Sequence, residues 1–173
     1  MILWHFGLGR LNARRLLNMK NSKNLTGIAG TYYLAAELSR RGYVALVTIK
    51  NTSAVDLIVS SQENFNSIGI QVKTSQTNKN QGWILSSKNE NLVSENIIYV
   101  FVNLKTDNSR PDFYIVPSKI VADTITNGHK KWLETLGKND QPHNDSAIRT
   151  FYDNENIFKE KWDLIENKLD NPK

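Results

Sequence analysis

Two short segments, one opening with an acid and the other strictly alternating, most constrain the fold of this chain. Residues 55–59 carry Asp56 and continue as an apolar run that indicates a strand. After a polar loop, residues 68–73 alternate apolar with small or polar residues, so the two sets fall on opposite faces of a second strand. Gln71 and Lys73 then project together, about 7 Å apart along the strand. If the strands pair as a hairpin, Asp56 comes near both side chains.

Composition indicates one domain and argues for hard-cation chemistry. The 173 residues fit a single domain with a sizeable core. Cysteine is absent, and the three histidines are scattered, so a zinc site is not expected and any metal would be held by oxygen. A count of 22 Lys and Arg against 17 Asp and Glu suits a polyanionic partner, although ordinary surface charge explains it nearly as well. No apolar run is long enough to cross a bilayer, and we expect a cytoplasmic protein without a membrane partner.

The first 18 residues differ in character from the rest of the chain. They combine apolar residues with later arginines, the reverse of the charge order in a secretory signal. Met19 precedes a polar, lysine-bearing stretch that resembles a normal protein start. We therefore expect residues 1–18 to be an extension outside the fold and residues 19–173 to be a single domain. An amphipathic arm that packs on the domain or on a partner is the alternative.

The remaining pattern predicts a mixed α/β domain. A helix is expected at 28–41, with further strands at 43–48, 83–85, 97–104 and 113–116. The almost continuously apolar 97–104 segment is typical of a central strand covered on both faces. Helices are expected at 118–126 and 130–136, with loops at 74–81 and 137–146 and a helical tail at 156–169. The order favours a central mixed sheet flanked by helices, with a helical C-terminal tail.

Over residues 27–117 the order of elements and the residues they carry resemble the PD-(D/E)XK nuclease superfamily. In that superfamily an acid on a first helix precedes a sheet, an acid opens the second strand, and an acid-x-Lys motif ends the third. The corresponding residues here are Glu37, Asp56 and Gln71-Val72-Lys73. The resemblance implies a restriction-endonuclease-like core. Val55 stands where the motif names proline, and Gln71 stands where an acid is usual, which removes one negative charge.

The resemblance implies a magnesium-dependent endonuclease that hydrolyses phosphodiester bonds in DNA. Asp56, the side-chain oxygen of Gln71, the carbonyl of Val72 and Glu37 would bind Mg²⁺, for which Mn²⁺ could substitute. Lys73 would orient or help to deprotonate the attacking water, or stabilise the phosphate in the transition state. Asp56, Gln71, Lys73 and Glu37 are thus the predicted catalytic residues. Because related nucleases often work in pairs, a homodimer is also implied.

A polar stretch directly follows the predicted site. Lys73, Thr74, Ser75 and Lys79 are candidates for contacts to nucleic-acid phosphates, since hydroxyls and amines commonly position a backbone. An ordinary polar loop is the competing interpretation.

Each candidate residue also has an ordinary structural interpretation. Asp56 could end a turn, Lys73 could be a solvated strand residue, and Glu37 could pair with Arg41 one helical turn later. Two further functional hypotheses therefore stay open. One is a non-catalytic module that binds nucleic acid or protein on the same fold. The other is an interaction protein that has no nucleic-acid partner.

Overall fold

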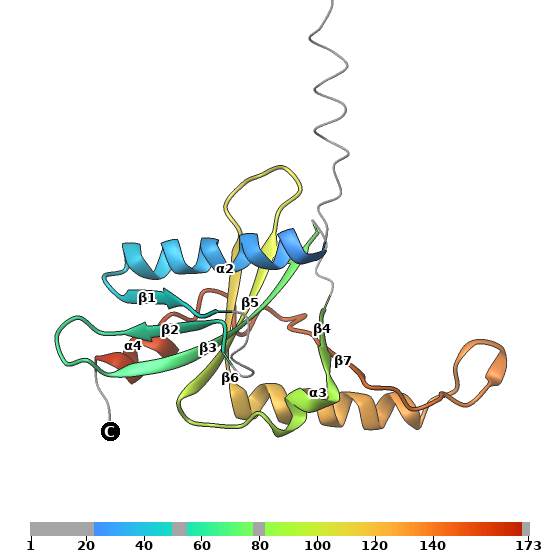
Figure 1. Ribbon diagram of the computed structural model, residues 1–173. Helices are drawn as coiled ribbons and strands as arrows, with labels where there is room; N and C mark the ends of the chain where they lie inside the picture. Colours follow the sequence, from blue (N-terminus) through green and yellow to red (C-terminus); the bar gives the residue numbers. More distant parts are fainter. Residues whose placement is uncertain (1–22, 50–54, 78–81, 171–173) are drawn as a thin grey trace, which may run out of the picture.

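The computed structural model describes residues 23–49, 55–77 and 82–170 (Figure 1). The predicted extension at 1–18 lies outside the described residues. The longer helices are α2 (Lys23–Arg40) and α3 (Ser118–Leu133), and a short α4 (Asp163–Leu169) comes near the C-terminus. The strands are β1 (Val44–Val47), β2 (Leu57–Ser60), β3 (Ser67–Gln76), β4 (Trp83–Ser86), β5 (Ile97–Leu104), β6 (Asp112–Pro117) and β7 (Ile148–Phe151), with 3-10 turns η1 (Ser87–Asn91) and η2 (Lys138–Asp140).

A five-stranded mixed sheet forms the centre of the domain, in the order β1-β2-β3-β5-β6. Only β3 and β5 pair in parallel, and the other neighbours in this sheet are antiparallel. Strands β4 and β7 form a separate two-stranded antiparallel sheet. The predicted fold class, a central mixed sheet flanked by helices with a helix near the C-terminus, is confirmed.

Helices cover both faces of the sheet (Figure 1). Leu34 and Leu38 of α2 pack with alternate residues of the strands and with Ile165 of α4 in one core cluster. Val121 and Ile125 of α3 pack on the other face, in a second cluster with aromatic residues of the strands. No helix within the described ranges is long and apolar enough to cross a membrane.

Strand β5 is buried on both sides, which explains its unbroken apolar sequence. Tyr99 and Phe101 belong to the cluster against α3, whereas Val100 and Val102 belong to the cluster against α2. All four side chains are fully buried. The prediction of a central strand at 97–104 is confirmed, with the same bounds.

Four local predictions need correction. The two helices expected after Pro117 are one continuous α3, which runs through Gly128 without interruption and ends at Leu133. The loop expected from Thr74 onwards begins later, because β5 pairs with β3 as far as Gln76. Strand β7 falls just after the predicted loop at 137–146, in a stretch without an expected element. The tail helix α4 begins only at Asp163, seven residues after the predicted start.

Close packing of α2 on β3 depends on Gly30. A Cβ atom at this position would lie 2.0 Å from Thr74 Oγ1 and 2.9 Å from Thr74 Cβ. Because the branched threonine cannot swing away freely, Gly30→Ala should lower the free energy of unfolding by about 1–3 kcal/mol. The measurement is urea denaturation followed by circular dichroism. Gly27→Ala is the matched control, since a Cβ there meets nothing within 4 Å, and equal effects of both substitutions would contradict the packing argument.

Candidate active site

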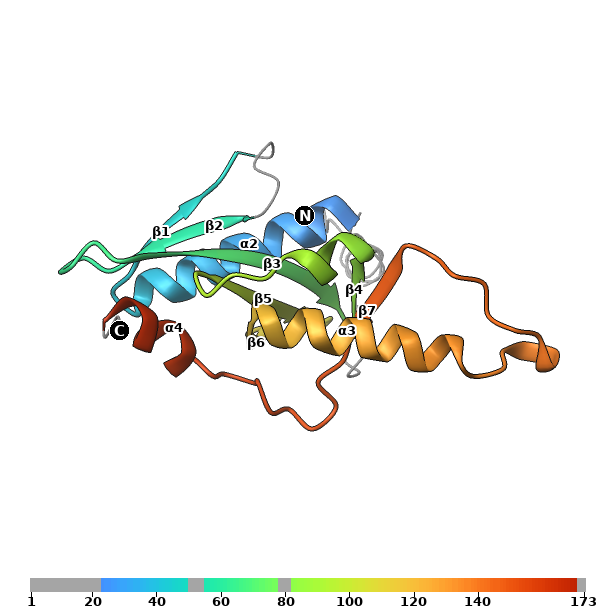
Figure 2. The same ribbon diagram turned by 90° about the horizontal axis from the view of Figure 1, so that it is seen from below.

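Strands β2 and β3 separate at the start of β2, which Asp56 directly precedes. Their pairing ends with Leu57 opposite Ile70. Beyond this pair, β3 continues along β5 as far as Gln76, and none of the described strands pairs with its other edge there. We call this opening, bordered by residues 55–57 and 70–74, the fork. Figure 2 shows β1 and β2 diverging from β3.

The backbone and the carboxylate of Asp56 are both held at the fork. Its N–H donates to the carbonyl of Ile70 at 2.8 Å, and its own carbonyl accepts a hydrogen bond from the Thr48 N–H at 3.0 Å. The carboxylate oxygen Oδ2 accepts hydrogen bonds from the Gln71 side-chain amide and, at 2.7 Å, from the Val72 N–H. The other oxygen, Oδ1, has no hydrogen-bond partner among the described residues.

The structure brings together three of the residues predicted from the sequence, Asp56, Gln71 and Val72. Along β3, Ile70 and Val72 belong to the core cluster against α2. Gln71 and Lys73 alternate with them, so both project from the opposite face of the strand. Both are half-buried, and within the described part of the chain Lys73 forms no ion pair. The structure thus places a carboxylate and an amide in contact at the fork, and Lys73 follows on the same face of β3 as Gln71. A joint role of the three residues stays a prediction.

A hollow of about 500 Å³ lies beside Asp56, under the N-terminal half of α2. Its lining combines helix residues with the ends of the strands: Lys23, Asn24, Gly27, Ile28, Thr31, Tyr32, Val47, Thr48, Asp56 and Val72. Among the described residues of this lining, Asp56 is the one carboxylate and Lys23 is the one cation. Among the described residues there is no group of three or more His, Asp and Glu side chains placed to hold a metal ion. A cation here would rely on a single carboxylate.

Glu37 does not line this hollow. It lies six residues after Thr31, about 9 Å further along the helix and on a different side of it. Its carboxylate pairs with Arg40 and Arg41 at 3.2 Å and with Arg110 at 3.1 Å. The contacts of Glu37 therefore match its ordinary structural interpretation, an ion pair with Arg41. Two more arginines, Arg40 and Arg110, pair with the same carboxylate. Thr31 is among the residues of α2 that share the lining of the hollow with Asp56, and only the helical period could have identified it.

The arginine that reaches Glu37 also ties the C-terminal segment to the domain. Arg110 contacts both oxygens of Glu160, at 3.1 and 3.0 Å. Burial acts to raise the pKa of Glu160, but hydrogen bonds from Arg110 and from the Trp162 indole outweigh it, and the pKa is lowered overall. Arg41 lies over the Trp162 ring at 4.1 Å. The surroundings of Glu37 are thus a cross-link between α2, β6 and the residues before α4.

The predicted phosphate-binding residues next to the site lie in different surroundings. The hydroxyl oxygens of Thr74 and Ser75 are buried and have no hydrogen-bond partner among the described residues. Thr74 packs beneath Gly30 of α2. Lys79 lies outside the described residues. The role of these residues in nucleic-acid binding stays a prediction.

Comparison with known proteins gives similarities at the level of structure. No family model matches the chain, and no curated protein matches it. A solved structure of a bacterial homing endonuclease, I-Ssp6803I, is similar over 86% of this chain and 94% of that chain, with 15% sequence identity and a TM-score of 0.49.

Proposed function

We propose that this protein is a metal-dependent endonuclease that hydrolyses phosphodiester bonds in DNA, with Asp56 at the centre of its site. One observation carries the proposal. At the fork, the Gln71 amide and the Val72 N–H hold one oxygen of the Asp56 carboxylate. Lys73, which has no ion-pair partner among the described residues, lies two residues after Gln71 on the same face of β3. A fixed carboxylate with an amine on the neighbouring strand suits a reaction in which negative charge builds up on a phosphate.

The oxygen donors at the fork fit a hard divalent cation. Oδ1 of Asp56 would be the principal ligand of Mg²⁺, and the side-chain oxygen of Gln71 and the carbonyl of Val72 are the further predicted donors. When bound, the metal would neutralise the scissile phosphate and lower the pKa of a bound water. Since Mg²⁺ in proteins is often held by one or two carboxylates together with substrate phosphates, a single carboxylate is compatible with this role.

Lys73 supplies the second chemical function in this proposal. Its ammonium group would orient the attacking water or stabilise the charge that develops on the phosphate. No described acidic residue neutralises it, so its positive charge remains available to a nucleic-acid phosphate. The sequence-based role of Glu37 as a ligand finds no support in its contacts with three arginines.

The described lining of the hollow holds one carboxylate, which also favours a second candidate, a non-catalytic module that binds nucleic acid. Such a protein would use Lys73 and Lys23 to contact phosphates without cutting the chain. Its binding should weaken steeply as salt is raised, because phosphate contacts release counterions. A homodimer, which would offer one site to each DNA strand, stays a prediction for either candidate.

The experiment that tests the proposal is a cleavage assay on supercoiled plasmid DNA. The purified chain should convert the plasmid to nicked and linear forms in Mg²⁺ or Mn²⁺ and should leave it intact in EDTA. Gel shifts over a range of salt concentrations, run on the same samples, separate binding from cutting. Salt-sensitive binding without products in either metal would reject the endonuclease and leave the non-catalytic module. The absence of both binding and products would reject both candidates.

A further inference from the structure

We propose that Gln71 is a positioning residue, whose side-chain amide holds the Asp56 carboxylate in place before any metal binds. The sequence assigns Gln71 a different part, that of a metal ligand through its oxygen. The inference deepens the function proposed above and rests on it for the identity of the cation. It concerns how the site is kept ready, and it can be tested without metal or DNA.

Three consecutive residues of β3 fix Asp56. The carbonyl of Ile70 accepts the Asp56 N–H at 2.8 Å, which sets the backbone. The Gln71 amide and the Val72 N–H both donate to the same carboxylate oxygen, Oδ2. Two donors on one oxygen restrict rotation of the carboxylate, and Oδ1 is left as the free ligand. The Val72 N–H belongs to the backbone, so the Gln71 amide is the part of this arrangement that a side-chain substitution can remove.

An acid at position 71 could not play this part. Two carboxylates in contact repel each other unless a proton or a cation lies between them. A site built from Asp56 and a second acid would therefore be ordered only with its metal or with a shared proton. The neutral amide replaces that repulsion with a charge-assisted hydrogen bond, which is among the stronger kinds in proteins. Compared with an acid at position 71, Gln71 therefore removes one unit of negative charge from the metal site. In return, the Asp56 carboxylate is held in place when no metal is bound.

The first test is a double-mutant cycle on thermal stability in EDTA. Gln71→Met removes the donor at similar size and should lower the melting temperature by about 3–6 °C in the wild-type background. In an Asp56→Ala background, where the acceptor is gone, the same substitution should lower it by less than about 1 °C. Gln76→Met is the matched control, because Gln76 is an exposed glutamine at the end of the same strand, and it should leave the melting temperature unchanged in both backgrounds.

The second test does not depend on the Asp56→Ala variant being folded. Gln71→Glu should melt lower than wild type in EDTA at neutral pH, and saturating Mn²⁺ should raise its melting temperature by more than it raises that of wild type. Equal losses from Gln71→Met in both backgrounds, or a Gln71→Glu protein as stable as wild type in EDTA, would overturn the proposal. Failure of the endonuclease is recognised separately, since it leaves plasmid DNA uncut whatever the result in EDTA.

Discussion

Replacing Asp56 with asparagine should reduce metal-dependent DNA cleavage by about 10²–10³-fold or more while the protein stays folded. Asparagine keeps an oxygen that can still accept the Val72 N–H, so the hydrogen bond at 2.7 Å has a replacement. It loses the negative charge, and among the residues that the structure describes no other carboxylate lines the hollow to attract the cation in its place. Affinity for Mn²⁺ should therefore fall together with the cleavage rate.

Single-turnover cleavage and calorimetric titration of Mn²⁺ measure the two effects on the same preparations. Asp123→Asn is the matched control, because Asp123 is an exposed aspartate of α3 paired with Lys119 and lies outside the hollow. This control should cleave DNA at the wild-type rate. An Asp56→Asn protein that cleaves as fast as wild type would place the metal elsewhere and remove the central residue of the proposed site.

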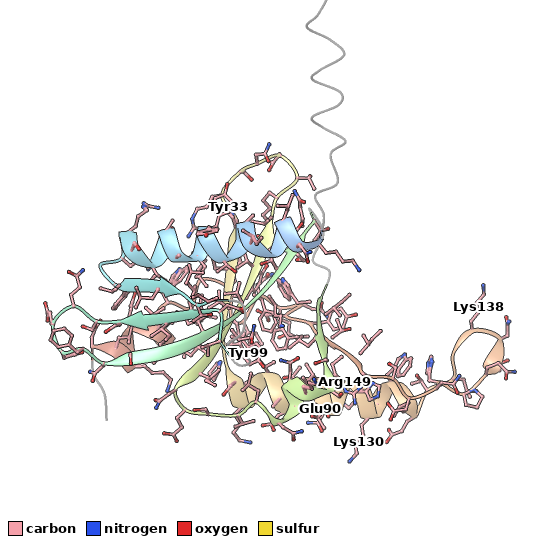
Figure 3. The ribbon with its side chains drawn as sticks, viewed as in Figure 1. Tyr33, Glu90, Tyr99, Lys130, Lys138 and Arg149 are labelled. Carbon is pink, nitrogen blue, oxygen red and sulfur yellow. The ribbon has the colours of Figure 1, made fainter. Side chains whose placement is uncertain are left out.

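Removing Glu90 should produce the largest loss of stability outside the hydrophobic core. Arg149 of β7 is buried, and its guanidinium contacts Glu90 and the carbonyls of Ser146 and Ile148 (Figure 3). With Glu90→Ala the buried arginine loses its direct ion-pair partner, and Asp145, which lies beyond ion-pair distance, is left as a carboxylate that interacts with it. Removing one partner of a buried ion pair lowers the free energy of unfolding by about 3–5 kcal/mol. Because Glu90 is partly exposed, we expect a loss of about 3 kcal/mol.

Chemical denaturation of a set of variants tests this expectation. The double variant Glu90→Leu with Arg149→Met should be more stable than Glu90→Ala alone, because it removes both charges and fills the space with apolar side chains. The control is Lys119→Met, which breaks an exposed ion pair and should cost no more than about 1 kcal/mol. If Glu90→Ala cost as little as that control, the ion pair would not anchor β7.

Strand β7 also shows why part of the fold escaped prediction. In the sequence, residues 148–151 are apolar, polar, polar and apolar in turn, so no period of two marks a strand, and Arg149 would be expected in solvent. The pairing with β4 does the opposite, because Arg149 and Phe151 point inward while Ile148 is exposed. The partner strand and Glu90 both lie more than fifty residues earlier. No local pattern records such a distant charge partner, whereas β5 was predictable because its own eight residues are apolar almost throughout.

The candidate site was likewise predictable from the sequence only in part. The closeness of Asp56 to Gln71 was predictable from the strand patterns, because a hairpin with alternating faces leaves few other arrangements. Glu37 was predicted as the metal ligand on the helix from its residue type alone, since it is the one acid of α2. Which part of α2 stands over the fork depends on how the helix crosses the sheet, and Gly30 above Thr74 sets this crossing. The helix therefore offers Thr31 to the hollow and directs Glu37 towards Arg110.

The fork also has a consequence for aggregation with other protein chains. From Gln71 onwards, β3 has an edge to which none of the described strands is added, and such an edge is a template on which a foreign strand can form hydrogen bonds. The Asp56 carboxylate occupies the first of these positions by accepting the Val72 N–H. A side chain proposed to serve catalysis thereby also blocks the start of the exposed edge. Selection for resistance to aggregation would then favour an aspartate at this position independently of any role in catalysis.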